Sequence, residues 1–222
     1  MLMTNLFSIF DPSTSLYFSL NWLSIMIPLF FIPNQFWLKK SKIFLFWFNI
    51  NNFLINEFKM YNKKKKLSIF MLLSLFFFIL NMNFLGMFPY IFTPSSHLII
   101  SLALSLTLWL SIMLYNWMKK TLNCFAHLVP LNTPIPLMLF MVLIETISNI
   151  IRPLTLAIRL TANMIAGHLL LCLLGSFSMM TNLNFILILY FMQFLLYTLE
   201  LAVAIIQSYV FMTLMSLYFN EL

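Results

Sequence analysis

The sequence predicts an all-α membrane protein with one N-terminal span, an interfacial amphipathic helix, a transmembrane hairpin and then two long, steeply tilted helices. Of its 222 residues, 63% are hydrophobic and only 8% are charged, and the mean hydropathy is +0.99. A soluble chain of this length could not bury so much apolar surface. The apolar segments, separated by lysines and prolines, indicate a single polytopic membrane domain over residues 1–222.

The first half of the chain divides into four predicted elements. Residues 15–32 form a candidate span that is interrupted by Pro28. Residues 43–58 carry apolar side chains on one helical face and asparagines on the other, which favours a helix lying in the membrane interface. Residues 67–88 and 98–118 are uncharged segments of span length on either side of a turn that contains prolines, so they predict a hairpin.

The lysines predict the orientation of the chain. They cluster at residues 39–42, 59–66 and 119–120, at the ends of apolar segments, and they supply most of the basic residues behind the net charge of +7. Basic residues favour the inner side of a membrane, so the N-terminus is expected on the outer side. This placement at segment ends argues against nucleic-acid binding.

Two longer apolar segments follow, at residues 134–174 and 183–219. A helix over the first of them would measure about 60 Å, twice the roughly 30 Å of the hydrocarbon core. We therefore expect each helix to be steeply tilted, broken or lying along the membrane plane. A turn at residues 175–182 is expected to join the two segments.

Arg159 is the most informative residue, because a guanidinium keeps its proton and is costly to place inside a bilayer. Glu145, Arg152 and Arg159 are spaced by seven residues. Seven residues advance a helix by nearly two full turns, so the three side chains form one charged stripe, with Asn163 to its side. An intramembrane stripe of this kind indicates a path for protons or another ion.

The second long segment carries a matching polar stripe. Gln193, Glu200 and Gln207 repeat the spacing of seven residues. His168 departs from the pattern, because nine residues separate it from Arg159 and place it on the opposite helical face. If both residues serve ion movement, His168 faces a different cavity or the helix bends between them.

Structural interpretations of some of these residues stay open. Glu145 and Arg152 are also compatible with a buried ion pair that holds helices together, and His168 is also compatible with an ordinary hydrogen-bonded histidine. His97 and His127 lie in loops, where solvated surface groups are expected.

The segment at residues 150–168, IIRPLTLAIRLTANMIAGH, closely resembles the signature of subunit a of the rotary F-type ATP synthase. Residues 5–12, 125–130 and 204–210 are similar to animal mitochondrial members of that family. The resemblance covers essentially the whole chain. It implies a proton-conducting stator subunit of the mitochondrial inner membrane that is not an enzyme on its own, with its lysines on the matrix side and its N-terminus on the intermembrane-space side.

The resemblance also implies partners and roles. The partners are a ring of c subunits, the peripheral stalk, other membrane subunits of the complex and the lipid bilayer. The resemblance implies that the two long helices pack against the ring. Bacterial relatives often carry Glu at the position of His168 and His at the position of Glu200, and this exchange implies a joint role for the two residues. By this resemblance, Arg159 corresponds to the indispensable arginine of the family, and Asn163 and Gln207 correspond to its polar neighbours. His168 and Glu200 belong to the outer half-channel, and Glu145 belongs to the inner one. Arg152 corresponds to a basic position of weaker requirement.

Other kinds of function find less support in the sequence. No glycine-rich phosphate loop with its lysine occurs, so this chain is expected to bind no nucleotide. Cys124 and Cys172 lie in different kinds of segment, and neither a disulfide, a metal site nor a cofactor is expected. A self-contained ion-coupled transporter would need internal repeats, and none is visible. A purely structural membrane subunit would not explain two polar stripes.

Overall fold

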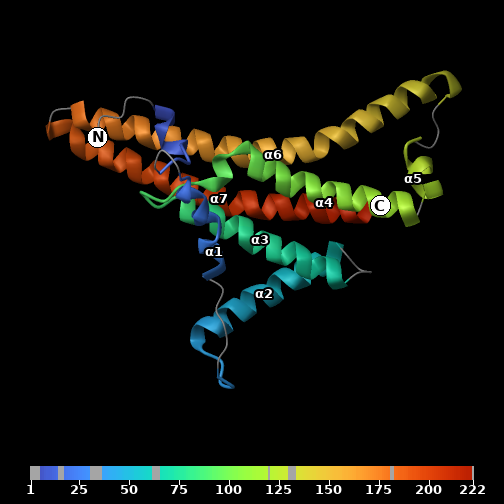
Figure 1. The fold of residues 1–222 in the computed structure, drawn as a ribbon, viewed down its shortest axis with the longest axis horizontal. Helices are drawn as coiled ribbons and strands as arrows, with labels where there is room; N and C mark the ends of the chain where they lie inside the picture. Colours follow the sequence, from blue (N-terminus) through green and yellow to red (C-terminus); the bar gives the residue numbers. More distant parts are fainter. Residues whose placement is uncertain are drawn as a thin grey trace.

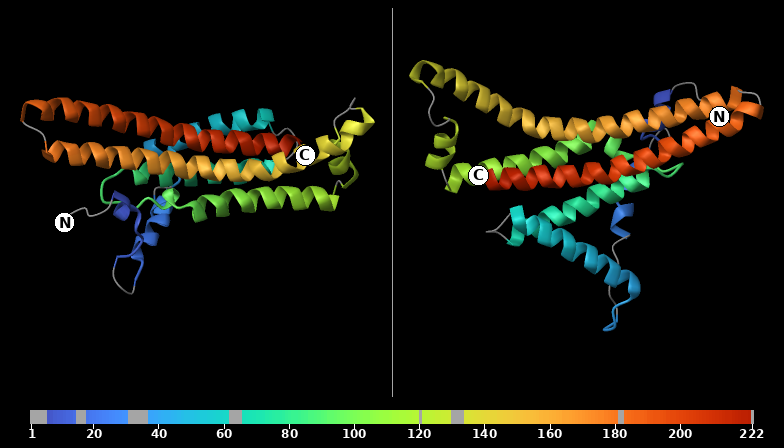
Figure 2. Two further views of the ribbon diagram at one scale, coloured as in Figure 1. Left: turned by 90° about the horizontal axis from the view of Figure 1, so that it is seen from above. Right: turned by 180° about the vertical axis from the view of Figure 1, so that it is seen from behind.

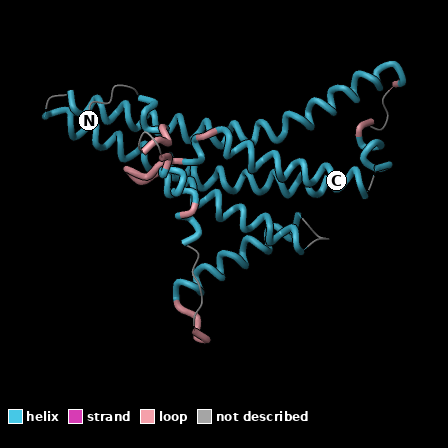
Figure 3. The backbone as a smooth tube through the Cα atoms, viewed as in Figure 1, coloured by secondary structure: helices cyan, strands magenta, loops and turns pink. Residues whose placement is uncertain are grey.

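The structure is a computed structural model that describes residues 6–14, 18–30, 37–61, 66–119, 121–129, 134–180 and 183–221. Within these ranges every regular element is a helix (Figure 3). Four of the helices in these ranges are long and apolar enough to cross a membrane. They are α3 (Lys66–Gly86), α4 (Leu98–Lys119), α6 (Ile135–Met180) and α7 (Leu183–Glu221). The predicted all-α membrane class is confirmed.

The two longest helices, α6 and α7, run antiparallel along the body of the molecule (Figures 1 and 2). They contain 46 and 39 residues, which correspond to about 70 and 60 Å. Helix α6 curves along its length, and Pro153 lies inside it (Figure 1). A proline in a helix removes one backbone hydrogen bond and favours a bend. Neither helix could stand upright in a hydrocarbon core of about 30 Å.

The shorter membrane helices flank this pair, with α3 packed mainly on α7 and α4 on α6. The central core lies where α3, α6 and α7 meet the end of α2 (Lys42–Tyr61). Its fully buried side chains include Phe58, Leu72, Leu156 and Phe211. Since lipid tails are as apolar as these side chains, close packing rather than water exclusion holds such helices together.

The expected span at residues 15–32 is not one continuous helix in its described part. A 3-10 helix η2 (Leu20–Ile25) leads into a single α-helical turn, α1 (Ile27–Phe30). Pro28 has no N–H to donate to a preceding helical turn, and it lies in the first turn of α1, where this donor would have no partner within the helix. The apolar stretch Leu20–Phe30 is shorter than the roughly 20 residues that a span requires. Residues 15–17 and 31–32 lie outside the described part.

Two further boundaries differ from the sequence prediction. Helix α6 continues past residue 174 to Met180, through most of the expected turn. Gly175 costs a helix only about 1 kcal/mol relative to alanine, and the apolar residues around it continue the helical pattern. A short helix α5 (Thr121–His127) also precedes the loop that leads to α6. The position of α2 in the membrane interface stays a prediction, although α2 does project from the helix body (Figure 1).

Candidate functional site

Arg159 lies on the outer surface of α6. The residues that pack inward on this part of the helix are Leu156, Ala157 and Leu160, whose side chains are at most 3% exposed. The helical repeat therefore turns Arg159 outward, where it is exposed together with Ala162. No residue in the described part of the chain forms a hydrogen bond or ion pair with its guanidinium. A permanent charge is thus presented on a surface bordered by small side chains.

One turn further along α6, a polar contact joins the two long helices. Asn163 Nδ2 donates a hydrogen bond to Gln207 Oε1 at 3.2 Å. Gln207 is only 5% exposed, and its Nε2 has no partner within the described ranges. Hydrogen bonds between membrane helices are worth about 0.6 kcal/mol on average, so this bond mainly fixes the helix register beside Arg159.

Glu200 of α7 is buried against the backbone of α6. Its side chain is 8% exposed, and its Oε1 is buried with no hydrogen-bond partner among the described residues. A Cβ built on Gly167 would lie 2.8 Å from Glu200 Cδ and 2.9 Å from Oε1, so any larger residue at this position would require the carboxylate to shift. A cavity of about 270 Å³ adjoins it and is lined in part by Asn163, Gly167, Glu200 and Gln207.

His168 follows Gly167 directly and is half-buried. Its Nε2 is buried and has no partner in the part of the chain that the structure describes. The ring of Phe10, from the N-terminal helix η1 (Leu6–Phe10), meets the imidazole edge-on, with ring centroids 6.5 Å apart. His168 and the Glu200 side chain of α7 therefore both lie next to Gly167, at one level of α6.

Glu145 and Arg152 form a second cluster, near the other end of α6. Arg152 Nη2 lies 3.9 Å from Glu145 Oε1, and its guanidinium carbon lies 5.1 Å from the centroid of the Tyr218 ring. Both charged side chains are about one-third exposed, so the pair is not the fully buried ion pair left open by the sequence. They line a cavity of about 550 Å³ together with Asn149 and Trp109.

The two clusters are well separated along α6. Glu145 precedes Gly167 by a length of helix of about 30 Å, and Arg159 lies between them. Gln193 is half-buried on α7, and among the described residues it forms no hydrogen bond with either cluster.

His97 differs from its sequence interpretation as a solvated surface group. Its Nε2 lies 3.0 Å from the Phe10 carbonyl oxygen, and its ring packs against Trp22 and Phe92, with centroids 5.1 and 5.3 Å away. The sequence carries no signal for this contact, because the bonded residues are 87 positions apart. The side chain of His127 lies outside the described part.

Cys124 and Cys172 are both free cysteines. Among the residues that the structure describes, no group of three or more histidine, cysteine, aspartate or glutamate side chains could hold a metal ion.

The long apolar helices of this chain carry ionisable side chains at membrane depth. Such residues are costly in a bilayer and are usually retained for function, which is typical of ion-translocating membrane proteins. Comparison with known proteins places the chain more closely. The family model for the ATP synthase A chain matches residues 16–220. The chain is 56% identical to ATP synthase subunit a of Anopheles quadrimaculatus, 54% to that of Drosophila melanogaster and 52% to that of Artemia franciscana, and these matches cover 99% of this chain and 99%, 99% and 100% of the relatives. The chain belongs to the ATP synthase A chain family.

Membership of this family fixes the broad role. The chain is a multi-pass membrane component of the mitochondrial ATP synthase that takes part in proton translocation and ATP synthesis. It is not an enzyme on its own.

Proposed function

We propose that this chain is the proton-conducting stator of the ATP synthase, forming two offset half-channels against a rotating ring of c subunits, with Arg159 separating them. One observation carries the proposal. Arg159 is exposed between two polar clusters, and no residue in the described ranges neutralises it. Because an unpaired charge is costly in a bilayer, its counter-charge is expected from another subunit. A carboxylate on each passing c subunit would supply that charge in turn.

The surface around Arg159 suits a moving partner. Ala162 and Ala166 are exposed on the same side of α6, and small residues allow a second helix to approach closely. The bond from Asn163 to Gln207 ties α6 to α7 beside this surface. A ring helix could therefore approach α6 closely on the side of the two alanines.

The outer half-channel is assigned to His168 and Glu200. Both are groups whose protonation responds to their surroundings. His168 follows Gly167 on α6, and Glu200 of α7 lies against Gly167. A proton that enters here would pass to the ring carboxylate and neutralise it. The neutral ring helix could then rotate into lipid, which a charged carboxylate would resist because of its desolvation cost.

The inner half-channel is assigned to Glu145 and the large cavity that it lines with Asn149. After almost a full turn, the ring carboxylate would lose its proton here. Arg159 does not relay protons, because a guanidinium stays protonated. Its charge favours the ionised form of a nearby carboxylate and repels protons from crossing directly between the half-channels, and both effects are strong where water is scarce.

The direction of flow follows from the proposed orientation. With the lysine clusters on the matrix side, His168 and Glu200 face the intermembrane space and Glu145 faces the matrix. Each proton that moves inward releases about 2.3 kcal/mol of free energy per 100 mV of membrane potential. The peripheral stalk and other membrane subunits would hold the chain still against the torque of the ring.

A self-contained ion-coupled transporter finds no comparable support. Transporters of that kind are built from repeats of similar size. Here α3 and α4 have 21 and 22 residues, whereas α6 and α7 have 46 and 39.

Side-specific labelling of cysteines tests the two half-channels. In a chain with Cys124→Ser and Cys172→Ser, a single Asn149→Cys probes the cavity beside Glu145, and a single Leu196→Cys probes the cavity beside Glu200. A membrane-impermeant thiol reagent should modify Asn149→Cys only from the matrix side and Leu196→Cys only from the opposite side of inner-membrane vesicles. Modification of both from the same side would overturn the proposed arrangement.

A further inference from the structure

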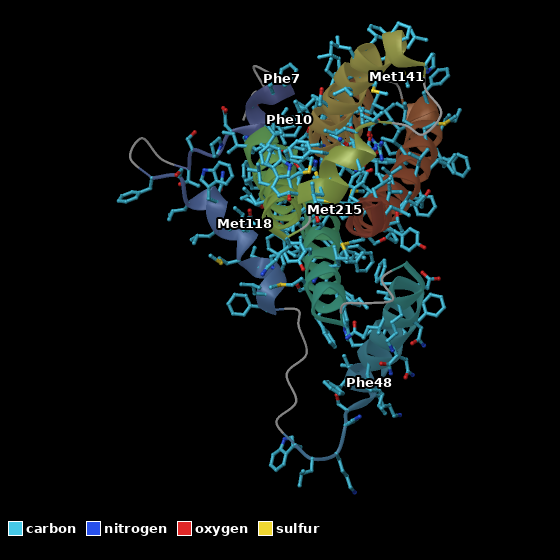
Figure 4. All side chains as sticks on the ribbon, turned by 90° about the vertical axis from the view of Figure 1, so that its right-hand side faces the viewer. Phe7, Phe10, Phe48, Met118, Met141 and Met215 are labelled. Carbon is cyan, nitrogen blue, oxygen red and sulfur yellow. The ribbon has the colours of Figure 1, made fainter. Side chains whose placement is uncertain are left out.

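The N-terminal segment packs on α6 although more than 120 residues of sequence separate the two elements. Helix η1 contacts α6, and its last residue, Phe10, presents its ring to His168 at an interplanar angle of 86°. Figure 4 shows Phe10 at the end of this short helix, beside the long helices. Phe10 is half-buried, and the His168 Nε2 next to it is buried. Phe10 therefore covers one side of the imidazole.

Helix η1 cannot hold this position by itself. It is a 3-10 helix of five residues, and short helices of this kind are marginal without tertiary contacts. Two hydrogen bonds at its C-terminal end tie it to later parts of the chain. Asn21 Nδ2 donates to the Asp11 carbonyl oxygen at 3.3 Å, and His97 Nε2 lies 3.0 Å from the Phe10 carbonyl oxygen. A carbonyl only accepts hydrogen bonds, so His97 must carry its proton on Nε2 to make this bond.

The loop that carries His97 is itself well fixed. Ser96 Oγ donates to the Thr93 carbonyl oxygen at 2.7 Å, and the His97 backbone N–H donates to the Pro94 carbonyl oxygen at 3.2 Å. Ser95 and Ser96 are buried. The His97 ring packs against Trp22 and Phe92, whose rings also contact each other. The bond to Phe10 thus joins the short helix η1 to a loop that is held by its own hydrogen bonds.

We propose that His97 is a positioning residue for proton uptake, because it holds Phe10 against His168 and so keeps the imidazole oriented and covered. The inference rests on the proposed function, in which His168 belongs to the outer half-channel. His97 itself does not carry the proton. It acts through the Phe10 backbone, and without its bond η1 would lift away more often and leave the His168 ring free to turn and open to bulk water.

Two substitutions separate the hydrogen bond from the ring packing. His97→Phe keeps an aromatic ring against Trp22 and Phe92 but has no donor. His97→Gln keeps an N–H donor at nearly the same distance from the backbone but has no ring. Each is introduced into the assembled ATP synthase in inner-membrane vesicles. Reaction of His168 with diethyl pyrocarbonate is followed by mass spectrometry, and proton flux through the membrane sector is measured in parallel.

Loss of a hydrogen bond of ordinary strength should raise the open population of η1, and with it the modification rate of His168, by about 2- to 10-fold. His97→Phe should show this rise together with slower proton flux, whereas His97→Gln should stay close to the parent on both measures. Phe10→Leu provides an independent variant if His97→Phe assembles poorly. It leaves the backbone bond in place, removes the ring, and should raise His168 modification as well.

The outcomes separate this inference from the proposed function. Unchanged His168 modification in both His97→Phe and Phe10→Leu would overturn the positioning role. Equal damage from His97→Gln and His97→Phe would overturn it too, because ring packing rather than the hydrogen bond would then be what matters. Normal flux in His168→Ala would instead overturn the role of His168 in the outer half-channel, whatever the labelling of the His97 variants shows.

Discussion

Replacement of Gly167 by alanine should impair proton conduction while leaving the helix pair intact. Gly167 is the point where α6 lets the Glu200 side chain of α7 lie against its backbone. An added Cβ would meet Glu200 Cδ at 2.8 Å and Oε1 at 2.9 Å, whereas ordinary contacts begin at 3.4 Å. The carboxylate must therefore move by about 0.6 Å or more. Because it ends a flexible side chain, it can move without separating the helices.

The magnitude follows from two opposing contributions. Overpacking in a close-packed interface typically costs about 1–3 kcal/mol. Alanine in place of a glycine inside a helix regains about 1 kcal/mol. The net effect on assembly should be small, at most about 2 kcal/mol. The effect on conduction should be larger, because misplacing a reacting group by a fraction of an ångström to 1 Å costs up to about 100-fold in rate.

The same helix offers a matched control. A Cβ built on Gly175 meets nothing within 4 Å. Gly175→Ala therefore carries the same chemical change in α6 without the contact. Assembly would be followed by native gel electrophoresis, and conduction by the passive proton flux of vesicles stripped of the catalytic sector. Adding Glu200→Asp, which shortens the side chain by one methylene, should recover part of the flux in Gly167→Ala. Equal flux in Gly167→Ala and Gly175→Ala would refute the reasoning.

Three further predictions concern the polar contacts. Asn163→Ala and Gln207→Ala should each weaken the α6–α7 contact by about 0.6 kcal/mol. In a double-mutant cycle based on thermal dissociation of the purified complex, the double variant should lose less stability than the sum of the single variants. Strict additivity would argue against the hydrogen bond. Exchanging His168 and Glu200 should reduce ATP synthesis by less than the summed effects of neutral substitutions at each position. A reduction equal to that sum would show that the two residues act separately. Tyr218→Leu should reduce proton release to the matrix, because it removes the aromatic ring that packs against the Arg152 guanidinium. Tyr218→Phe keeps the ring and should conduct normally. Proton flux in vesicles measures both variants.

The membrane class and the principal helices could be predicted from the sequence because they depend on local composition. The uncharged run that became α3 is long enough to span a bilayer, and charge-poor runs of twice that length had to form α6 and α7. The stripe through Glu145 and Arg159 also follows from helical periodicity alone. The ends of elements were less predictable, since a glycine in a helix costs too little to stop α6 at residue 175.

Contacts between distant segments could not be predicted in this way. The fit of Glu200 against Gly167 depends on the register between two helices, which no pattern within either helix reveals. The contact of Phe10 with His168 depends on His97, a loop residue whose position is set by its own aromatic neighbours. The interruption of the first apolar segment was predictable from Pro28, but its division into a 3-10 helix and a single α-helical turn was not.

Coupled ATP synthesis in Arg159 variants tests the central claim most directly. Arg159→Gln removes the charge between the two clusters, and Arg159→Lys keeps the charge but loses the planar fork of donors. The account predicts that Arg159→Gln assembles with the complex but supports no proton-driven ATP synthesis in inner-membrane vesicles, and that Arg159→Lys is severely impaired. Full coupled synthesis in assembled Arg159→Gln complexes would contradict it, since protons would then drive the ring without a fixed charge separating entry from exit.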